Sequence, residues 1–92
     1  MSSDDWFVYI VRCQDDTLYT GITKDLNRRL AQHNAGRGGA KYTQPRRPVR
    51  LVYAEAASCR AAAARREYQI KHLSPQGKLA LIDAGNAHFR RP

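Results

Sequence analysis

The chain has 92 residues, a length that fits one domain with a modest core and leaves no room for a large buried cofactor. It carries 16 Lys and Arg residues against 8 Asp and Glu residues, a formal net charge of +8, which excludes an acidic binding protein and points first to a polyanionic partner. Hydrophobic residues make up 42%, too many for a disordered chain, and no apolar run approaches the roughly 18 residues of a membrane span.

The predicted elements begin with a β-hairpin. Residues 6–13 are rich in β-branched and aromatic side chains, which predicts a strand that is buried on both faces. Turn-forming residues follow at 14–17, and residues 18–22 predict a second strand. Gly21 inside this strand indicates either a bulge or a place where another group approaches the backbone.

The pairing of this hairpin decides whether its two tyrosines can share a site. Side chains alternate between the faces of a sheet, and directly paired residues lie on the same face. Tyr9 and Tyr19 therefore share a face if Tyr9 pairs with Gly21 and Val11 pairs with Tyr19, whereas a two-residue turn would separate them. For a shared site we predict an odd-length connection or a bulge near residues 13–17.

A helix, a basic loop and a third strand are predicted next. Thr23 is a candidate N-cap for a helix over residues 24–35, and Gly36 is its predicted end. Residues 37–48 form a loop punctuated by Gly and Pro that carries several bases. The β-branched and aromatic content of residues 49–54 predicts the third strand.

Two further helices complete the pattern. Ser58 is the predicted start of a helix that runs to about residue 72, with an alanine run of high helix propensity. Ser74 at the cap and Pro75 at the first helical position predict the start of the last helix. Gly85 is its predicted end.

The order ββαβαα predicts an α+β fold in which helices flank a small, mostly antiparallel sheet. We expect a single domain over residues 1–92, with a core over about 6–84 and a loose tail over 85–92. Cys13 and Cys59 have no metal-binding spacing and are too few for a disulfide framework. Together with an acidic N-terminus that does not resemble a signal peptide, they predict a protein of the reducing cytoplasm.

The positive charge is concentrated in the middle of the chain. Residues 24–71 hold twelve bases and three acids. A solvated basic surface is the simpler interpretation of such a segment, but clustering on this scale favours nucleic acid as the partner.

The first helix places polar groups beside its apolar face. At about 100° per residue, Arg29 and His33 border the face that carries Leu26 and Leu30. Arg28 points away from that face. An arginine half-buried against a sheet needs an anion, although it can also extend to the rim while the histidine fills a core position.

The second helix repeats this pattern with the opposite charge. Glu67 shares the inward face with Ala63 and Ile70. This carboxylate has two interpretations, either an ion pair with Arg29 or the anchor of a divalent cation, because Mg²⁺ is often held by one or two carboxylates and water.

Tyr9, Tyr19, Arg29, His33 and Glu67 together form a set that suits phosphodiester hydrolysis. That reaction needs a proton acceptor, a guanidinium for the phosphate oxygens and a metal ion for the charge that develops in the transition state. Each tyrosine taken alone is more simply a core residue.

The segments around the two tyrosines resemble the half-motifs of the GIY-YIG endonuclease family. VYI at residues 8–10 resembles the first half-motif and retains Tyr9, and YTG at residues 19–21 resembles the second with Thr in place of Ile. The stretches YTGITKDLNRRLAQHN, GAKYTQPRRPVRLVY and RREYQIKHLSPQGKLALI extend the resemblance over residues 6–83, in the small single-domain bacterial branch.

The resemblance implies a metal-dependent endonuclease built on a three-stranded antiparallel sheet flanked by helices. It implies DNA as the substrate and a single Mg²⁺ or Mn²⁺ ion as the cofactor. Tyr9 and Tyr19 would be the strand tyrosines, one of which positions or deprotonates the attacking water. Arg29 would bind the phosphate, His33 would relay a proton, and Glu67 would bind the metal. Asn86 is left without a role.

A nuclease of this kind also needs contacts to the nucleic-acid backbone. The candidates are Lys24, Arg28, Lys41, Arg46 and Arg47. Tyr42 either stacks on a base or packs within the protein. Two other interpretations stay open: a basic DNA- or RNA-binding module without turnover, and an RNA-associated structural protein. The preferred DNA structure, single-stranded or otherwise, also stays open, as does a protein partner that supplies specificity.

Overall fold

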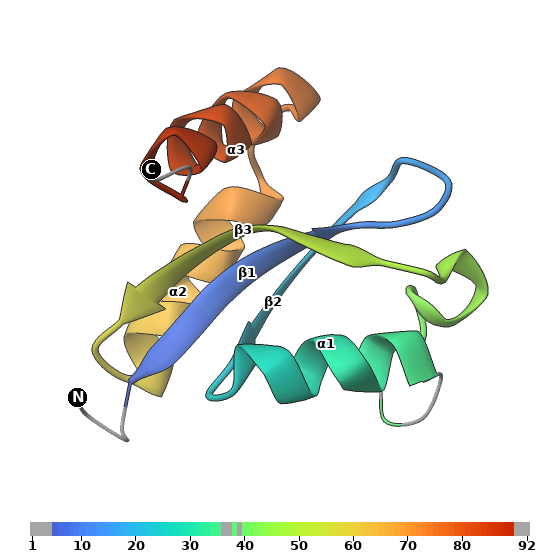
Figure 1. Ribbon diagram of the computed structural model, residues 1–92. Helices are drawn as coiled ribbons and strands as arrows, with labels where there is room; N and C mark the ends of the chain where they lie inside the picture. The colour runs from blue at the N-terminus through green and yellow to red at the C-terminus, as the bar shows by residue number, and fades with distance from the viewer. Residues whose placement is uncertain (1–4, 36–37, 39, 90–92) are drawn as a thin grey trace.

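The computed structural model describes residues 5–35, 38 and 40–89, the last four of them by their backbone alone (Figure 1). The elements are β1 (Trp6–Arg12), β2 (Leu18–Thr23), α1 (Leu26–Ala35), a short 3-10 helix (Gln44–Arg46), β3 (Arg50–Ala57), α2 (Arg60–Lys71) and α3 (Pro75–Phe89). The predicted α+β class and the order ββαβαα are confirmed.

The three strands form one antiparallel sheet in the order β2-β1-β3. Because β1 is central and helices cover both of its faces, its side chains are buried in alternating directions. Val8, Tyr9, Ile10 and Val11 are all at most 2% exposed. The expectation of a strand buried on both faces is therefore confirmed, while β3 continues to Ala57, beyond the predicted end of the third strand.

The hairpin has the predicted parity. Tyr9 pairs with Gly21 and Val11 pairs with Tyr19, and the register between β1 and β2 is unbroken. The connection over residues 13–17 has an odd length, so no bulge is needed to bring the tyrosines to one face. Their ring centroids lie 6.5 Å apart.

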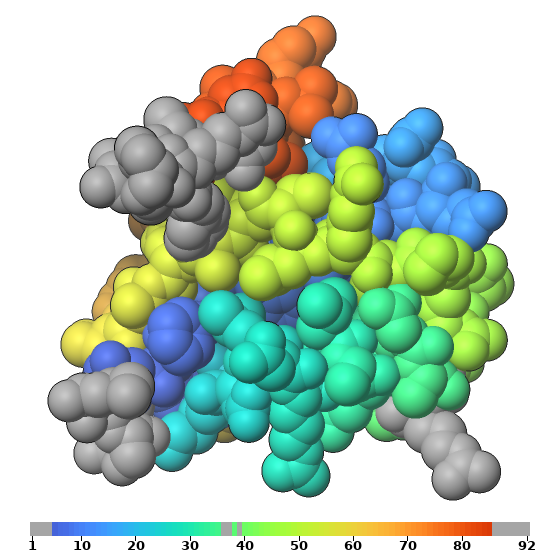
Figure 2. All heavy atoms as spheres, viewed as in Figure 1, coloured from blue at the N-terminus to red at the C-terminus, as the bar shows by residue number. Residues whose placement is uncertain are grey.

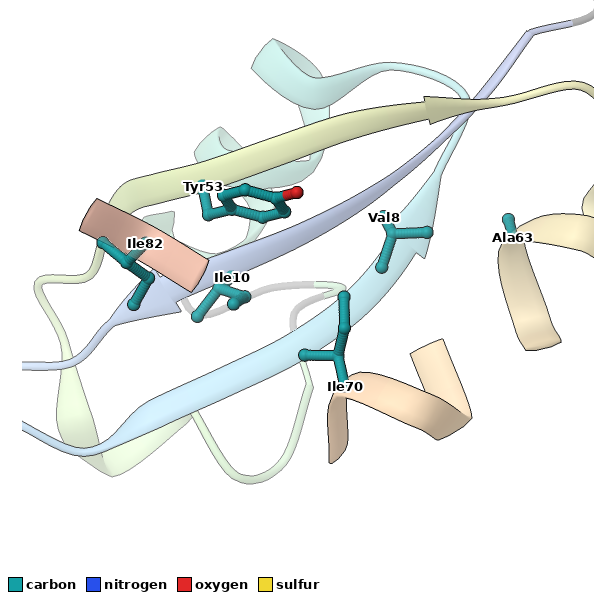
Figure 3. Close-up of a cluster of buried hydrophobic side chains, with 6 residues drawn as sticks. All are labelled: Val8, Ile10, Tyr53, Ala63, Ile70 and Ile82. Atoms are coloured by element: carbon teal, nitrogen blue, oxygen red, sulfur yellow. The ribbon is translucent and has the colours of Figure 1, made fainter. Parts of the chain in front are cut away.

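Each face of the sheet has its own apolar cluster. On one face, α2 and α3 pack on strand side chains in a cluster of Val8, Ile10, Tyr53, Ala63, Ile70 and Ile82 (Figure 3). On the other face, α1 contributes Leu26 and Leu30 against Tyr9, Val11, Cys13 and Val49. The functional side chains predicted on β1, β2 and α1 consequently belong to this second face.

The first helix begins later than predicted. Its capping group is Asp25, whose Oδ1 accepts a hydrogen bond from the Arg28 backbone N–H at 3.0 Å. Thr23 instead accepts from the Asp25 N–H at 3.1 Å, so it closes the turn that leads into the helix. Thr and Asp are comparable caps, and only the course of the chain after β2 distinguishes them.

The start of α2 also differs from the prediction by one residue, whereas the start of α3 agrees with it. Cys59, not Ser58, is the N-cap of α2, and its Sγ accepts from the Ala62 N–H at 3.5 Å. Ser74 caps α3 through a hydrogen bond from the Gly77 N–H at 3.0 Å. Pro75 occupies the first helical position as predicted.

The prediction that Gly85 ends the last helix is wrong, because α3 continues to Phe89. Gly85 is needed for packing: a Cβ at this position would lie 2.6 Å from Cδ1 of Tyr53. The loose tail predicted after Gly85 is therefore helical over 86–89, and residues 90–92 lie outside the described part of the chain. Gly36, the predicted end of the first helix, also lies outside it. Of the helices described, none is long and apolar enough to cross a membrane.

Candidate functional site

Tyr9 is the centre of a polar cluster on the face of the sheet that α1 covers. Its ring lies over Gly21 of β2, where a Cβ would stand 2.5 Å from the Tyr9 hydroxyl oxygen. Of the two explanations for this glycine, close approach is therefore correct, since the β1–β2 register is regular. Any larger residue at position 21 would displace the hydroxyl.

A chain of buried hydrogen bonds runs from Tyr9 through His33 to Thr43. The Tyr9 hydroxyl lies 2.9 Å from His33 Nε2, and His33 Nδ1 lies 2.8 Å from Thr43 Oγ1. The Thr43 hydroxyl donates its proton to the Ala40 carbonyl at 2.9 Å. Because a hydroxyl has one proton, Thr43 must accept from Nδ1, which makes Nδ1 the protonated nitrogen of a neutral His33.

This tautomer directs the Tyr9 proton. With Nδ1 protonated, Nε2 of His33 has a free lone pair, so the Tyr9 hydroxyl donates to it. Burial, together with the positive charge of Arg29, lowers the pKa of His33 and keeps the ring neutral. Burial is also the main cause of the raised pKa of Tyr9, which keeps the hydroxyl protonated. The hydrogen bond is thus directed from Tyr9 to His33, and both pKa shifts favour the neutral form of the pair.

Arg29 approaches the same hydroxyl from α1. Its Nε donates to the Tyr9 hydroxyl oxygen at 3.3 Å, and its Nη1 donates to Gln32 Oε1 at 3.0 Å and to the Gly38 carbonyl. None of the ion pairs among the described residues includes Arg29. The guanidinium is half-buried without a carboxylate, which is the environment in which an arginine binds an anion.

Tyr19 belongs to an aromatic column beside this cluster. Its ring meets His33 edge-on at 5.5 Å between centroids and stacks on Tyr42 at 6.0 Å. The Arg46 guanidinium lies 4.0 Å from the centroid of the Tyr42 ring and also pairs with Asp15 at 3.0 Å. Tyr42 is therefore packed within the protein while 38% of it is exposed.

Glu67 lies on α2, with its side chain 23% exposed, and forms an ion pair with Lys71 at 3.4 Å. The predicted alternative of an ion pair with Arg29 is not present. The carboxylate borders a pocket of about 490 Å³ together with Ile22 of β2. Its charge is the last of the causes that raise the pKa of Tyr9, after burial and Tyr19.

The donor set around Glu67 restricts the metal that could bind. Among the described residues, no three His, Cys, Asp or Glu side chains form a cluster that could hold a metal ion. A zinc site of four protein ligands is therefore not built here. One carboxylate in an open pocket does fit Mg²⁺, which keeps several waters and completes its shell with substrate phosphates.

The predicted backbone-binding residues surround this cluster. Lys24 is exposed just before α1 and Arg28 is exposed in its first turn, and Lys41 and Arg47 are exposed in the loop before β3. In Figure 2 the atoms of α1 and of this loop lie side by side on the face turned to the viewer. Arg46 differs, because its ion pair with Asp15 already compensates its charge.

Sequence reasoning missed two residues that organise the site. Thr43 is fully buried and orients His33, and Asn34 joins α1 to the start of β3 by exchanging hydrogen bonds with the N–H and C=O of Val49. Thr43 lies in an irregular loop, where no periodicity indicates which polar side chains are buried. Asn34 is an exposed residue near the end of α1, and its helical position does not indicate Val49 as its partner.

The chain is similar to known proteins over most of its length. A family model described as the GIY-YIG catalytic domain matches residues 5–79. A UPF0213 protein of Desulfotalea psychrophila is 54% identical over 84 residues, which are 91% of this chain and 76% of that protein. One from Staphylococcus haemolyticus is 56% identical over 77 residues, 84% of this chain and 93% of that protein. The solution NMR structure of a UPF0213 protein from Bacillus halodurans has a TM-score of 0.56 and 44% identity, covering 87% of this chain and 84% of that chain.

Proposed function

The chain belongs to the GIY-YIG catalytic-domain family, a family of nucleases, and from this we propose that it is a metal-dependent endonuclease that hydrolyses phosphodiester bonds of DNA. The observation that carries the proposal is the buried chain from Tyr9 through His33 to Thr43, with Arg29 beside it. In this hydrogen-bonded chain each group donates to the next, so the Tyr9 proton is directed at His33. Ordinary core packing does not require such an ordered set of donors and acceptors.

In this proposal Arg29 binds the scissile phosphate. Its guanidinium faces no carboxylate and lies against the Tyr9 oxygen, so a phosphate that reaches it is held next to the proton acceptor. Charge-assisted hydrogen bonds from arginine to phosphate oxygens are among the strongest in proteins. Arg29 therefore positions the substrate and stabilises the charge that develops on it.

Tyr9 and His33 move the proton of the attacking water. The water gives a proton to the Tyr9 oxygen while Tyr9 passes its own proton to Nε2 of His33. The water oxygen then bonds to phosphorus, and the bond from phosphorus to the leaving oxygen breaks. Burial raises the pKa of Tyr9, so little free phenolate is present near neutral pH, and passing the proton on to His33 removes the need for a free phenolate. Tyr19 packs against His33 and holds the imidazole in place.

Glu67 is the proposed anchor of a single Mg²⁺ or Mn²⁺ ion. When bound, the ion supplies positive charge to the phosphate and its leaving oxygen. The ion pair with Lys71 is partly exposed and stabilises the helix by only about 0.3–0.5 kcal/mol, so exchange of Lys71 for a metal ion costs little.

The remaining bases form the proposed surface for the DNA backbone. They are Lys24, Arg28, Lys41 and Arg47, with Arg46 and Tyr42 at the edge of the site. The proposal extends to a role in DNA repair or processing in the cytoplasm, with a protein partner that supplies specificity.

Replacement of Glu67 tests the proposal. We expect Glu67→Gln to abolish cleavage of labelled DNA in Mg²⁺ or Mn²⁺, while binding in EDTA persists and the melting temperature in EDTA changes little. The matched control is Asp83→Asn, an exposed carboxylate on α3, which should cut at the wild-type rate. A folded Glu67→Gln variant that cuts normally would remove the metal assignment.

The competing function is a basic DNA- or RNA-binding module without turnover. The ion pair between Glu67 and Lys71 is the observation that favours it, because the carboxylate already has a partner. A panel of labelled DNA structures and RNAs, incubated with Mg²⁺, Mn²⁺ or EDTA, separates the two functions. Binding without product under every metal condition would favour the binding module.

A further inference from the structure

A second pocket lies at the end of the sheet, on the face that α3 covers. It has a volume of about 560 Å³ and is lined by Arg12, Asp16, Thr17, Leu18, Pro75, Lys78 and Leu79. Tyr9 points to the α1 face, and alternation along β1 directs Arg12 to the opposite face. Figure 2 shows the β1–β2 turn (blue) between the start of α3 (orange) and the loop before β3 (green). None of the residues that line this pocket belongs to the site around Tyr9.

Arg12 has an unmet hydrogen-bonding group in this region. Its Nε is buried and has no hydrogen-bond partner, and no other buried side-chain nitrogen or oxygen in the described part of the chain shares this condition. Buried polar groups of proteins are nearly always satisfied, so this exception marks Arg12 as a residue whose hydrogen bonding is incomplete within the protein. The partner that suits a guanidinium is an oxyanion.

The position of Arg50 strengthens this requirement. Arg12 and Arg50 are direct register partners on β1 and β3, so two like charges stand opposite each other in the sheet. Such a pair is destabilising unless a counter-charge lies between its members. A smaller pocket of about 290 Å³ is lined by both arginines and by Pro48, and it shares Arg12 and Asp16 with the larger pocket.

The larger pocket adds an apolar wall and a third cation. Leu18, Pro75 and Leu79 form the wall, and Leu79 is 45% exposed although it lies on a core-facing helix. Lys78 brings the cations of the two pockets to three, against the single carboxylate of Asp16. A ligand that suits both pockets is anionic at one end and apolar at the other.

We propose that the two pockets form a nucleotide-binding site in which Arg12 and Arg50 bind a phosphate group and the base packs on Leu18, Pro75 and Leu79. Lys78 then faces an adjoining phosphate. The proposal rests on the proposed function in one respect, that a nucleic-acid strand is the expected source of the nucleotide; a free mononucleotide has the same chemistry. Pro48 lines the smaller pocket and directly follows Arg47 in the chain. The proposed site therefore adjoins the basic loop before β3.

Side-chain NMR in EDTA tests the site without requiring cleavage. The resonance of the Arg12 Nε–H group and the backbone amides of Thr17 and Leu79 are followed during titration with a ten-nucleotide single-stranded DNA and, separately, with adenosine monophosphate. We expect all three to shift with the oligonucleotide. Saturation by adenosine monophosphate at equal concentration would assign the site to free nucleotides, which retains the pocket and its ligand chemistry.

Variants measure the contribution of the site to affinity. Arg12→Gln with Arg50→Gln should lower the magnitude of the slope of log K against log salt by about two, and Lys78→Gln by about one. Arg65→Gln, which removes an exposed base of α2, is the matched control for a general loss of charge and should leave the Arg12 resonance shift unchanged. If the double variant Arg12→Gln with Arg50→Gln does not fold, Lys78→Gln and the NMR titration of the wild-type protein still test the proposed site.

Failure of this inference and failure of the proposed function give different results. Shifts confined to residues around Arg29, with the Arg12, Thr17 and Leu79 signals unchanged by either ligand, would overturn the second site and leave the nuclease intact. Absence of cleavage in wild-type protein, with the Arg12 shifts present, would overturn the nuclease and leave the site. Unchanged signals throughout both titrations would overturn the site.

Discussion

The Tyr9 hydroxyl makes two side-chain hydrogen bonds, one to His33 and one to Arg29. The Tyr9 ring is buried by the α1 face, and its hydroxyl reaches His33 Nε2 and Arg29 Nε at once because Gly21 leaves room beneath it. The direction of the proton in this group depends on Thr43, which fixes the tautomer of His33. One threonine hydroxyl thus decides which atom accepts the Tyr9 proton.

Thr43→Val keeps the size of the side chain and removes the acceptor of the His33 Nδ1 proton. We expect cleavage to fall roughly 10- to 100-fold, as when partners that orient a histidine are removed elsewhere. The buried N–H left without an acceptor should destabilise the fold by about 1–3 kcal/mol. Single-turnover cleavage and the ¹⁵N shifts of the His33 ring measure both consequences.

Thr43→Ser is the control for this substitution, because it retains the hydroxyl. It should preserve the Nδ1-protonated tautomer and most of the rate. If Thr43→Val kept both the wild-type rate and the wild-type tautomer, Thr43 would have only a packing role.

Stability should depend on pH through His33. Burial and then the charge of Arg29 lower its pKa in the folded protein, whereas the unfolded chain has the ordinary value of about 6.5. The unfolded state therefore binds more protons as the pH falls below about 6.5, and stability is lost from there down through the folded pKa. Above about 6.5 this contribution is fully present.

Unfolding in urea at pH 7.5 and at pH 5.5 measures this effect. The loss assigned to His33 should be roughly 1 kcal/mol between these values. His33→Gln should show a smaller loss over the same interval. Identical losses in the wild type and the variant would place the acid sensitivity in another group.

At the scale of elements, Gly85 shows how packing overrides local preference. A glycine near the end of an apolar stripe predicts a helix end, yet α3 passes through it because the Tyr53 ring occupies the space of a side chain. The Tyr53 hydroxyl donates to Glu55, which also binds Arg66, and burial is the first cause that raises the pKa of Tyr53 to about 12. The Tyr53 ring is therefore held by the hydrogen bond of its hydroxyl to Glu55 and by its close packing on Gly85.

Gly85→Ala should destabilise the protein although alanine favours helices by about 1 kcal/mol. The added Cβ would stand 2.6 Å from the Tyr53 ring, and forcing a group into a packed core costs typically 1–3 kcal/mol. The clash exceeds the gain because Tyr53 is fixed, so we expect a net loss in urea unfolding. Gln76→Ala, at an exposed position of the same helix, should change stability by less than about 0.5 kcal/mol. A stabilised Gly85→Ala variant would show that α3 can move away from β3.

At the scale of the whole molecule, the net charge of +8 governs affinity for nucleic acid. If about six phosphates are neutralised, log K should fall with log salt at a slope near −5. Because Asp15 already compensates Arg46, the informative pair of exposed bases is Lys41 and Arg47. Their joint replacement by Gln should lower the magnitude of the slope by about two, measured by fluorescence anisotropy in EDTA. A response that does not vary with salt would contradict a backbone-binding surface on this loop.

Several features followed from the sequence because they depend on one segment at a time. The β-branched and aromatic content of residues 6–13 predicted a strand buried on both faces. Parity predicted that a shared tyrosine site requires a pairing such as Tyr9 with Gly21, which the sheet has. Helical spacing predicted that Arg29 borders the apolar face of the first helix and that Arg28 points away from it. Motif resemblance predicted the family that the comparisons then showed, while the roles of the site residues stay predictions.

Only the tertiary structure decided which partners these residues meet. The contacts of Thr43 with His33 and of Gly85 with Tyr53, and the register of Arg12 with Arg50, join segments that are far apart along the chain. Periodicity describes which face of its own element a residue occupies, but it carries no information on what packs against that face. The sequence by itself therefore determined the elements, their faces and the family. Packing decided the tautomer of His33, the continuation of α3 and the lack of a hydrogen-bond partner at Arg12 Nε. Each of these depends on atoms that a different segment of the chain supplies.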